Sequence, residues 1–431
     1  MSRIYRLICF TFTLLIGAGV QLHAQISQSP YTLQGLGDIQ GMGLMSNESM
    51  GGVGIALGRP FYINNINPAL LPYNTATSFD ISLTAEKRDL SRDTIANSNS
   101  SADFNYLAFA FPLMRGRWTF SVGLKPYSVV DYSIRTTSNI SGADHQANMI
   151  VEGTGGLNQA YFATGARFFN QLYLGVRAGY LFGAILDETS IEPFTINDED
   201  TVFSTQFKST YARRVSCSDM IFGGGAAYTV KLSDDFLITV GGIYDLKADI
   251  SAKRLVTLEQ RTWFENSELD QDTILFDDNG TLSLPSRFGV GISLVNGFKW
   301  AAGIDYTVQN WSEYRNYLGE SENLKDTYKL SAGVEFIPNY NSVVSYFERV
   351  LYKAGFYYYN TPYSKDDIQV SEFGINFGAG LPMSGGSLIN LSIGYGRRGF
   401  TDQALVKEDI FKFGLGITFN DQRWFIRRKY D

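Results

Sequence analysis

Apolar and polar residues alternate with a period of two along most of the chain. In residues 389–395 the odd positions are Ile, Leu, Ile and Tyr, and the even positions are Asn, Ser and Gly. The same alternation runs through residues 172–180, 288–294, 300–308 and 411–419. Because successive side chains of a β-strand point to opposite faces, each run predicts a strand with one apolar face and one small or polar face.

Continued along the chain, the pattern predicts about fourteen strands joined by short and long connections in turn. The predicted strands lie near residues 77–86, 104–113, 117–132, 157–168, 172–190, 205–231, 235–257, 282–296, 298–312, 327–337, 349–360, 367–382, 387–400 and 407–419. The long, polar connections are predicted at 87–103, 133–156, 191–204, 258–281 and 313–326, and one connection on the short side, 338–348, is also long. Short turns at one end and long loops at the other are typical of transmembrane β-barrels, and an even strand count places both ends of the chain in the periplasm.

Periodicity alone does not separate a membrane barrel from a soluble β-sandwich, because both have one apolar strand face. The composition favours the barrel: 14% of residues are aromatic and 43 are glycine, as aromatic girdles and close strand packing require. No stretch after residue 24 reaches ~18 apolar residues without a charge, so membrane-spanning helices are not predicted. The fold class expected is therefore all-β, a transmembrane antiparallel barrel of about fourteen strands that leaves no strand edge unpaired.

The first 24 residues are typical of a secretory signal peptide. Arg3 and Arg6 form a basic start, residues 7–20 are mostly apolar, and Ala24 is a small residue before a cut at Gln25. Cys9 lies at the start of the apolar run, so a lipid-anchored cleavage site is not expected. Export together with a β-barrel predicts the outer membrane of a diderm bacterium.

Residues 25–76 differ from the rest because they lack sustained alternation and are rich in Gly, Asn, Met and Pro. Apolar residues such as Ile55, Leu57 and Phe61 give this segment something to bury, so we predict an N-terminal hatch in the lumen of the barrel. A flexible periplasmic arm is the alternative. The predicted organisation is residues 1–24 as signal peptide, 25–76 as hatch, 77–419 as barrel, and 420–431 as periplasmic tail.

Several short motifs, in this order, resemble the FadL-type outer-membrane transporters of long-chain fatty acids and aromatic compounds. They are Asn67-Pro68-Ala69 at the end of the hatch-like segment, residues 284–291 (LPSRFGVG), 305–307 (DYT) with 311–312 (WS), and 353–357 (KAGFY) with 361–362 (TP). The resemblance implies a fourteen-stranded barrel, a hatch motif at Asn67, Pro68 and Ala69, and an inward kink of the third strand that opens the wall sideways. We assign that lateral opening to Gly123 and Pro126, because proline cannot donate to a strand ladder and strand glycine often marks a bend.

The tail at 423–430 is similar to that of Bacteroidetes-type outer-membrane proteins. Some relatives of the fold in that group serve protein secretion, so two functions stay open. The first is a passive channel through which hydrophobic small molecules, long-chain fatty acids or aromatic compounds, pass a hatch-gated lumen. The second is a non-transporting barrel that acts as a structural or shuttle component of an outer-membrane protein secretion complex.

Charge and rare residues narrow the chemistry further. Without the signal the chain has 34 basic and 43 acidic residues, a net charge of −9, which disfavours a nucleic-acid partner. His145 is the one histidine outside the signal, so histidine-dependent catalysis and zinc binding are not expected. Cys217 is interpreted as structural, and Asp198-Glu199-Asp200 and Asp366-Asp367 as solvated loop charge. We predict no enzyme activity, cofactor or metal, and expect membrane lipid, lipopolysaccharide and a hydrophobic ligand as partners, besides secretion proteins under the second function.

Overall fold

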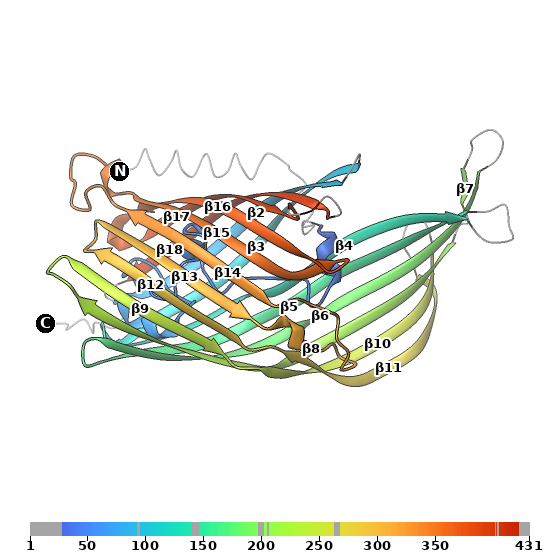
Figure 1. Cartoon of the computed structure of the whole chain (residues 1–431), viewed down its shortest axis with the longest axis horizontal. Coiled ribbons are helices and arrows are strands. Elements are labelled where there is room, and N and C mark those ends of the chain that lie inside the picture. Colours follow the sequence, from blue (N-terminus) through green and yellow to red (C-terminus); the bar gives the residue numbers. More distant parts are fainter. Residues whose placement is uncertain are drawn as a thin grey trace, which may run out of the picture.

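The computed structural model is a closed barrel of antiparallel strands (Figure 1). It describes residues 28–92, 95–139, 146–196, 202–204, 207–262, 268–400, 402 and 405–421. Successive strands pair in chain order from residue 77 to 196 and from residue 287 to 421, and the last strand pairs with the first wall strand over Thr77–Ser91 and Lys407–Asp421. This last pairing closes the sheet on itself.

The wall is built of β-strands, with short helical turns in the N-terminal segment and the connections. The strands are β1 (Asp38–Ile39), β2 (Thr77–Arg92), β3 (Ile95–Met114), β4 (Trp118–Asn139), β5 (Gln146–Phe168), β6 (Leu172–Ile196), β7 (Val202–Ser204), β8 (Phe207–Lys231), β9 (Phe236–Asp245), β10 (Ala248–Thr262), β11 (Glu268–Leu284), β12 (Arg287–Asn296), β13 (Trp300–Gln309), β14 (Thr327–Phe336), β15 (Leu351–Lys365), β16 (Ile368–Pro382), β17 (Leu388–Arg398) and β18 (Lys407–Asp421). The helical turns are η1 (Pro30–Leu33), α2 (Met45–Glu48), η2 (Pro68–Tyr73), η3 (Trp311–Glu313), η4 (Phe347–Arg349) and η5 (Ser384–Gly386).

The described residues form fourteen wall strands, as the sequence predicted. β9 and β10 both pair with β8, so they are two halves of one strand that is interrupted at residues 246–247. β11 and β12 continue one another in the same way around Pro285, since β11 pairs with β10 and β12 with β9. β1 and β7 are short additions that pair with β4 and β6.

The predicted orientation of the last two strands is confirmed. β17 and β18 are adjacent and antiparallel, with Ile393 opposite Phe413. Ile393 is 61% exposed and Phe413 is 49% exposed, whereas Thr418 is fully buried inside the barrel. Odd-numbered apolar side chains therefore face outward, where a bilayer would cover them, and even-numbered ones face the lumen.

One side of the barrel is much taller than the other. β4, β5, β6 and β8 have 22 to 25 residues, while β12, β13 and β14 have 10 each. The prediction of long loops at 87–103, 133–156, 191–204 and 258–281 is therefore wrong in most of their length, because paired strands run through them. Charged and polar side chains interrupt the period of two in these stretches, although exposed apolar ones such as Met149, Leu258 and Phe276 remain. The backbone ladder needs no apolar side chain.

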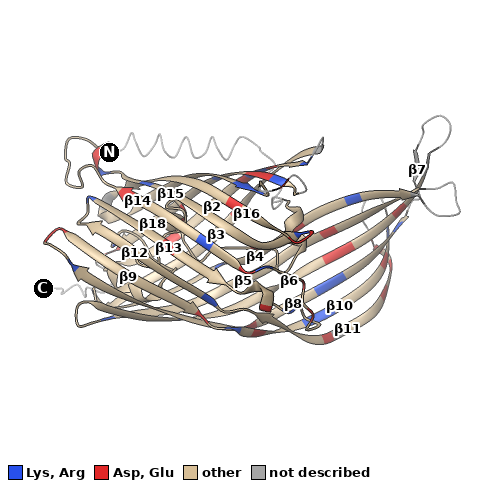
Figure 2. Cartoon of the chain, viewed as in Figure 1, with Lys and Arg blue, Asp and Glu red and all other residues tan. Residues whose placement is uncertain are grey.

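Charged side chains gather in the part of the tall strands that lies away from the short turns (Figure 2). Ion pairs join these charges across strands: Arg213 of β8 with Asp187 of β6 at 2.8 Å, and Arg261 of β10 with Glu188 of β6 at 2.6 Å. Arg213 is 42% exposed, and an ion pair with such exposure belongs in water. The tall extension therefore lies beyond the apolar band of the wall.

Residues 28–76 lie inside the barrel rather than beside it (Figure 1). Their apolar side chains and inward-facing wall residues form the core: Leu44 and Ile63 pack with Tyr106 and Ala163 in one cluster. The interior is thus filled by the N-terminal segment. None of the helices in the described part of the chain is long and apolar enough to cross a membrane.

Candidate functional site

The predicted motif Asn67-Pro68-Ala69 forms the tight turn that begins η2. The Asn67 side-chain oxygen accepts from the Ala69 N–H at 3.0 Å, and its nitrogen donates to the Ile55 carbonyl at 2.6 Å. Asn64 acts similarly and donates to the Gly54 and Leu57 carbonyls. The amides therefore satisfy backbone groups in an irregular buried segment, as expected for these two residues. The Asn65 side chain, in contrast, is buried without a hydrogen-bond partner.

Wall side chains hold the inner part of the segment, residues 42–74, by its backbone. One Asp305 carboxylate oxygen accepts from the N–H groups of Gly54 and Ile55 at 2.7 and 2.8 Å. The Arg177 guanidinium donates to the Asn65 carbonyl at 2.9 Å. These bonds replace the water that an irregular backbone would otherwise need.

Glycines on the inward face of the wall make room for the same backbone. A Cβ at Gly355 would lie 2.0 Å from the Met50 carbonyl carbon, and one at Gly241 would lie 2.2 Å from the Ile55 oxygen. From the sequence, Gly355 was noted only as part of the 353–357 motif, and Gly241 was not singled out. The concentration of glycines on one strand face was the available signal that another backbone presses on that face.

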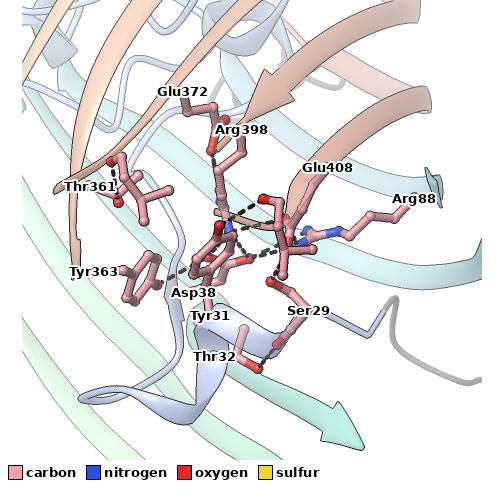
Figure 3. A network of polar contacts seen from close by, with 12 residues as sticks. Ser29, Tyr31, Thr32, Asp38, Arg88, Thr361, Tyr363, Glu372, Arg398 and Glu408 are labelled. Atoms are coloured by element: carbon pink, nitrogen blue, oxygen red, sulfur yellow. Dashed lines mark hydrogen bonds and ion pairs between the residues drawn. The ribbon is translucent and has the colours of Figure 1, made fainter. Parts of the chain in front are cut away.

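Residues 29–40, here called the outer arm, lie between β4 and a cluster of charged wall residues (Figure 3). Asp38 and Ile39 pair with Val129 and Ser128 of β4. On the other side, the Asp38 carboxylate accepts from Arg398 at 2.8 Å and from Arg88 at 3.4 Å. Burial alone would raise the pKa of Asp38, but the two guanidiniums outweigh it and lower that pKa below its ordinary value.

The ion cluster around the outer arm continues into the wall (Figure 3). Arg398 also pairs with Glu372 at 2.7 Å, and Arg88 pairs with Glu408 at 2.9 Å. The Ser29 hydroxyl donates to Glu408 at 2.5 Å. These contacts hold the outer arm near both of its ends, at Ser29 and at Asp38. The sequence pattern did not predict them, because the residues involved lie on strands that are far apart in the chain.

A cavity of about 890 Å³ lies between the outer arm and the inner part of the segment. Its lining includes apolar residues at the wall, among them Phe104, Leu124 and Pro126, and residues of the N-terminal segment such as Met42 and Ile66. Thirteen of its lining residues are charged: Asp38, Glu48, Glu86, Arg88, Asp103, Lys125, Asp131, Arg287, Asp305, Lys329, Glu372, Arg398 and Lys412. The chamber is therefore amphipathic, with apolar and ionic surfaces in one space.

The ladder between β3 and β4 stops beside this cavity. Its last pair is Leu107 with Leu124, while β4 continues with β5 on its other side as far as Asn139. Pro126 lies two residues beyond the last pair, at a register shift in the β4–β5 ladder. Gly123 lies within the paired part, opposite Ala108.

Close packing leaves no room for a side chain at Gly123. A Cβ there would lie 2.5 Å from the Leu107 carbonyl oxygen and 2.6 Å from the Tyr161 ring. A branched residue at 123 would therefore damage the wall itself. Of the two residues that we assigned to a lateral opening, Pro126 lines the cavity and Gly123 does not.

Comparison with known proteins places the chain in a family. A family model described as BamG matches residues 4–431. The chain belongs to the BamG family. No curated protein matches its sequence.

The fold is similar to those of solved outer-membrane transporters. The Ralstonia pickettii toluene transporter TbuX has a TM-score of 0.53 at 15% identity, over 89% of this chain and 99% of that one. The Pseudomonas putida toluene transporter TodX scores 0.53 at 15% identity, over 90% and 99%. A Pseudomonas aeruginosa FadL homologue scores 0.52 at 12% identity, over 89% and 99%. At these identities the similarity shows the fold, which is the FadL-type barrel that the sequence motifs resemble.

The remaining candidate residues carry little chemistry. Asp366 and Asp367 form a tight turn in which Asp367 pairs with Lys325 at 2.9 Å. Cys217 is buried in an apolar cluster. No group of metal-binding side chains occurs among the residues that the structure describes. The signal peptide, His145, residues 198–200 and the tail at 423–430 lie outside the described residues.

Proposed function

We propose that this BamG-family barrel is an outer-membrane channel for passive uptake of hydrophobic small molecules, with residues 28–76 as its plug. The observation that carries the proposal is the meeting of the cavity with the end of the β3–β4 ladder. Phe104, Leu124 and Pro126 line the cavity and lie where β4 separates from β3 and pairs with the outer arm instead. An apolar ligand gains nothing by entering water, so a sideways route from cavity to bilayer suits it.

The lining favours long-chain acids over plain hydrocarbons as the ligand. Lys329 lines the cavity, with its ammonium 4.7 Å from the centroid of the Tyr357 ring. An ammonium group in that position can accept the carboxylate of an amphipathic ligand. The apolar residues at the wall end of the cavity would then cover the alkyl chain.

Uptake through the wall is tested by replacing Pro126. Pro126→Val supplies a backbone N–H that can extend the β3–β4 ladder, so uptake of radiolabelled oleate should fall severalfold in a host that lacks its own fatty-acid channel. Pro112→Val is the matched control. Pro112 lies at the short-turn end of β3, where it is already opposite Thr119 of β4 in the β3–β4 ladder. Oleate uptake that is equal in the two variants would contradict a route through this part of the wall.

A specific observation favours a second function, that of a non-transporting component of an outer-membrane protein secretion complex. The inner part of the N-terminal segment packs so closely on wall glycines that a Cβ added at Gly355 or Gly241 would lie within 2.0–2.2 Å of its backbone, and this close packing opposes displacement of the segment. A barrel whose lumen stays filled by such a segment can act as a structural component of a complex without conducting a ligand. Stoichiometric protein partners in gently extracted material, with no bound small molecule, would support this second function.

A further inference from the structure

The connection between β14 and β15 exposes apolar side chains to an unusual degree. It spans residues 337–350, whereas the other described connections at this end of the barrel, such as those around Gly116 and Gly297, are tight turns. Val343 is 96% exposed, Val344 is 100% exposed and Phe347 is 71% exposed. Contiguous exposed apolar residues of this kind mark an interaction surface.

Internal hydrogen bonds hold the connection in this shape. The Asn339 N–H donates to the Glu348 carbonyl at 2.8 Å, and the Ser345 N–H donates to the Ser342 hydroxyl at 3.2 Å. The Tyr352 hydroxyl donates at 3.2 Å to the carbonyl of Phe347, which is the first residue of the single turn η4. The apolar tip is therefore presented by a built loop.

The loop continues the outward surface of the wall. Its base carries exposed aromatic rings, with Tyr340 stacked on Phe298 at 5.4 Å between ring centroids. The adjoining strand ends, Phe336 and Tyr352, are 44% and 40% exposed on the same rim. Figure 1 shows the loop rising from the end of the barrel to the side, away from the barrel axis. Aromatic residues at such a rim lie at the level of the lipid headgroups.

We propose that the 337–350 loop is an anchor that inserts Val343, Val344 and Phe347 into the interface of the leaflet at the short-turn end. The loop has the composition that an interface selects: apolar side chains at the tip, aromatic rings at the base, and Arg349 stacked over Tyr346 at 5.3 Å. A protein partner fits less well. An aromatic side chain buries about 150–250 Å² and a valine less, so these three side chains fall well short of a stable protein interface, which buries about 800 Å² on each partner.

The loop's depth can be measured with spin labels on the full mature chain in vesicles of phosphatidylethanolamine and phosphatidylglycerol. A Cys217→Ala background removes the buried thiol, and Val344→Cys then carries the nitroxide. We expect its collision rate to be higher with oxygen than with a water-soluble nickel chelate, as for a group below the headgroups. Asp234→Cys is the matched control in another turn at the same end of the barrel, where the native side chain is polar and 98% exposed. The label there should collide more often with the chelate than with oxygen.

A second label excludes an effect of the nitroxide itself. Glu348→Cys lies in the same loop on its polar part, so its label should be more accessible to the chelate than the label at 344. Chelate-dominated collisions at 344 that equal those at 234 would overturn the anchor and leave the tip free for a protein partner. A label at 344 that is deeper than both controls supports the anchor.

Discussion

Asp305→Ala should loosen the inner part of the N-terminal segment without unfolding the barrel. The Asp305 carboxylate is the acceptor for the buried N–H groups of Gly54 and Ile55, at 2.7 and 2.8 Å. An alanine leaves both buried donors without their acceptor. Each buried donor left unsatisfied costs about 1–3 kcal/mol, so the segment should lose about 2–6 kcal/mol of local stability.

Amide hydrogen exchange in lipid nanodiscs measures this loss directly. Since about 1.4 kcal/mol corresponds to a tenfold change in an equilibrium, peptides that cover residues 43–57 should exchange between about 30-fold and 10⁴-fold faster. Peptides of β17 should be unchanged because the wall keeps its ladder. Asp305→Asn is the matched control, since its amide oxygen can accept the same two bonds. The reasoning is refuted if the alanine variant exchanges as slowly as the native chain.

Three further predictions concern the wall, the plug and the outer arm. Ile393→Lys places a charge on the outward face and should cost about 2–4 kcal/mol of folding into lipid, whereas Ser392→Lys, which points into the cavity, should fold almost normally; equal losses would invert the orientation. Gly355→Ala should destabilise the barrel by about 1–3 kcal/mol in a denaturant titration, while Gly41→Ala, which meets nothing within 4 Å, should not. Because the folded pKa of Asp38 is below its ordinary value of 3.8, its contribution is present above that pH and is lost only as pH falls further, so the arm should stay protected from exchange at pH 5; release at pH 5 would contradict the ion pairs.

The sequence predicted the wall better than the interior. The period of two placed fourteen strands correctly because each outward face must be apolar, and β17 and β18 show this clearly. It failed where charged and polar side chains interrupt the alternation, as in residues 133–156, since a strand above the membrane need not keep a hydrophobic pattern. The alternation also does not tell how much space a lumen position has: Thr418 is fully buried and donates to Asp80 at 2.9 Å, so a lysine there would not fit.

The interior depends on contacts between segments that are far apart in the chain. The Asn67-Pro68-Ala69 turn was readable because asparagine and proline act on their own neighbours. Asp38 and Arg398 form an ion pair although they lie on different strands far apart in the chain, so no local sequence pattern predicts it. Pro126 indicated from the sequence that strand pairing is interrupted near this point. The sequence did not predict which residues form the cavity beside it.

Native mass spectrometry of gently extracted barrel tests the central claim most directly. The account predicts a bound amphipathic acid in the native protein, retained in Thr307→Val and lost in Thr307→Trp. Thr307 lines the cavity directly opposite Lys329 in the β13–β14 ladder, so a tryptophan there would crowd the ammonium that holds the carboxylate. A native chain that carries no small molecule, or a ligand that survives Thr307→Trp, would contradict a ligand-binding channel.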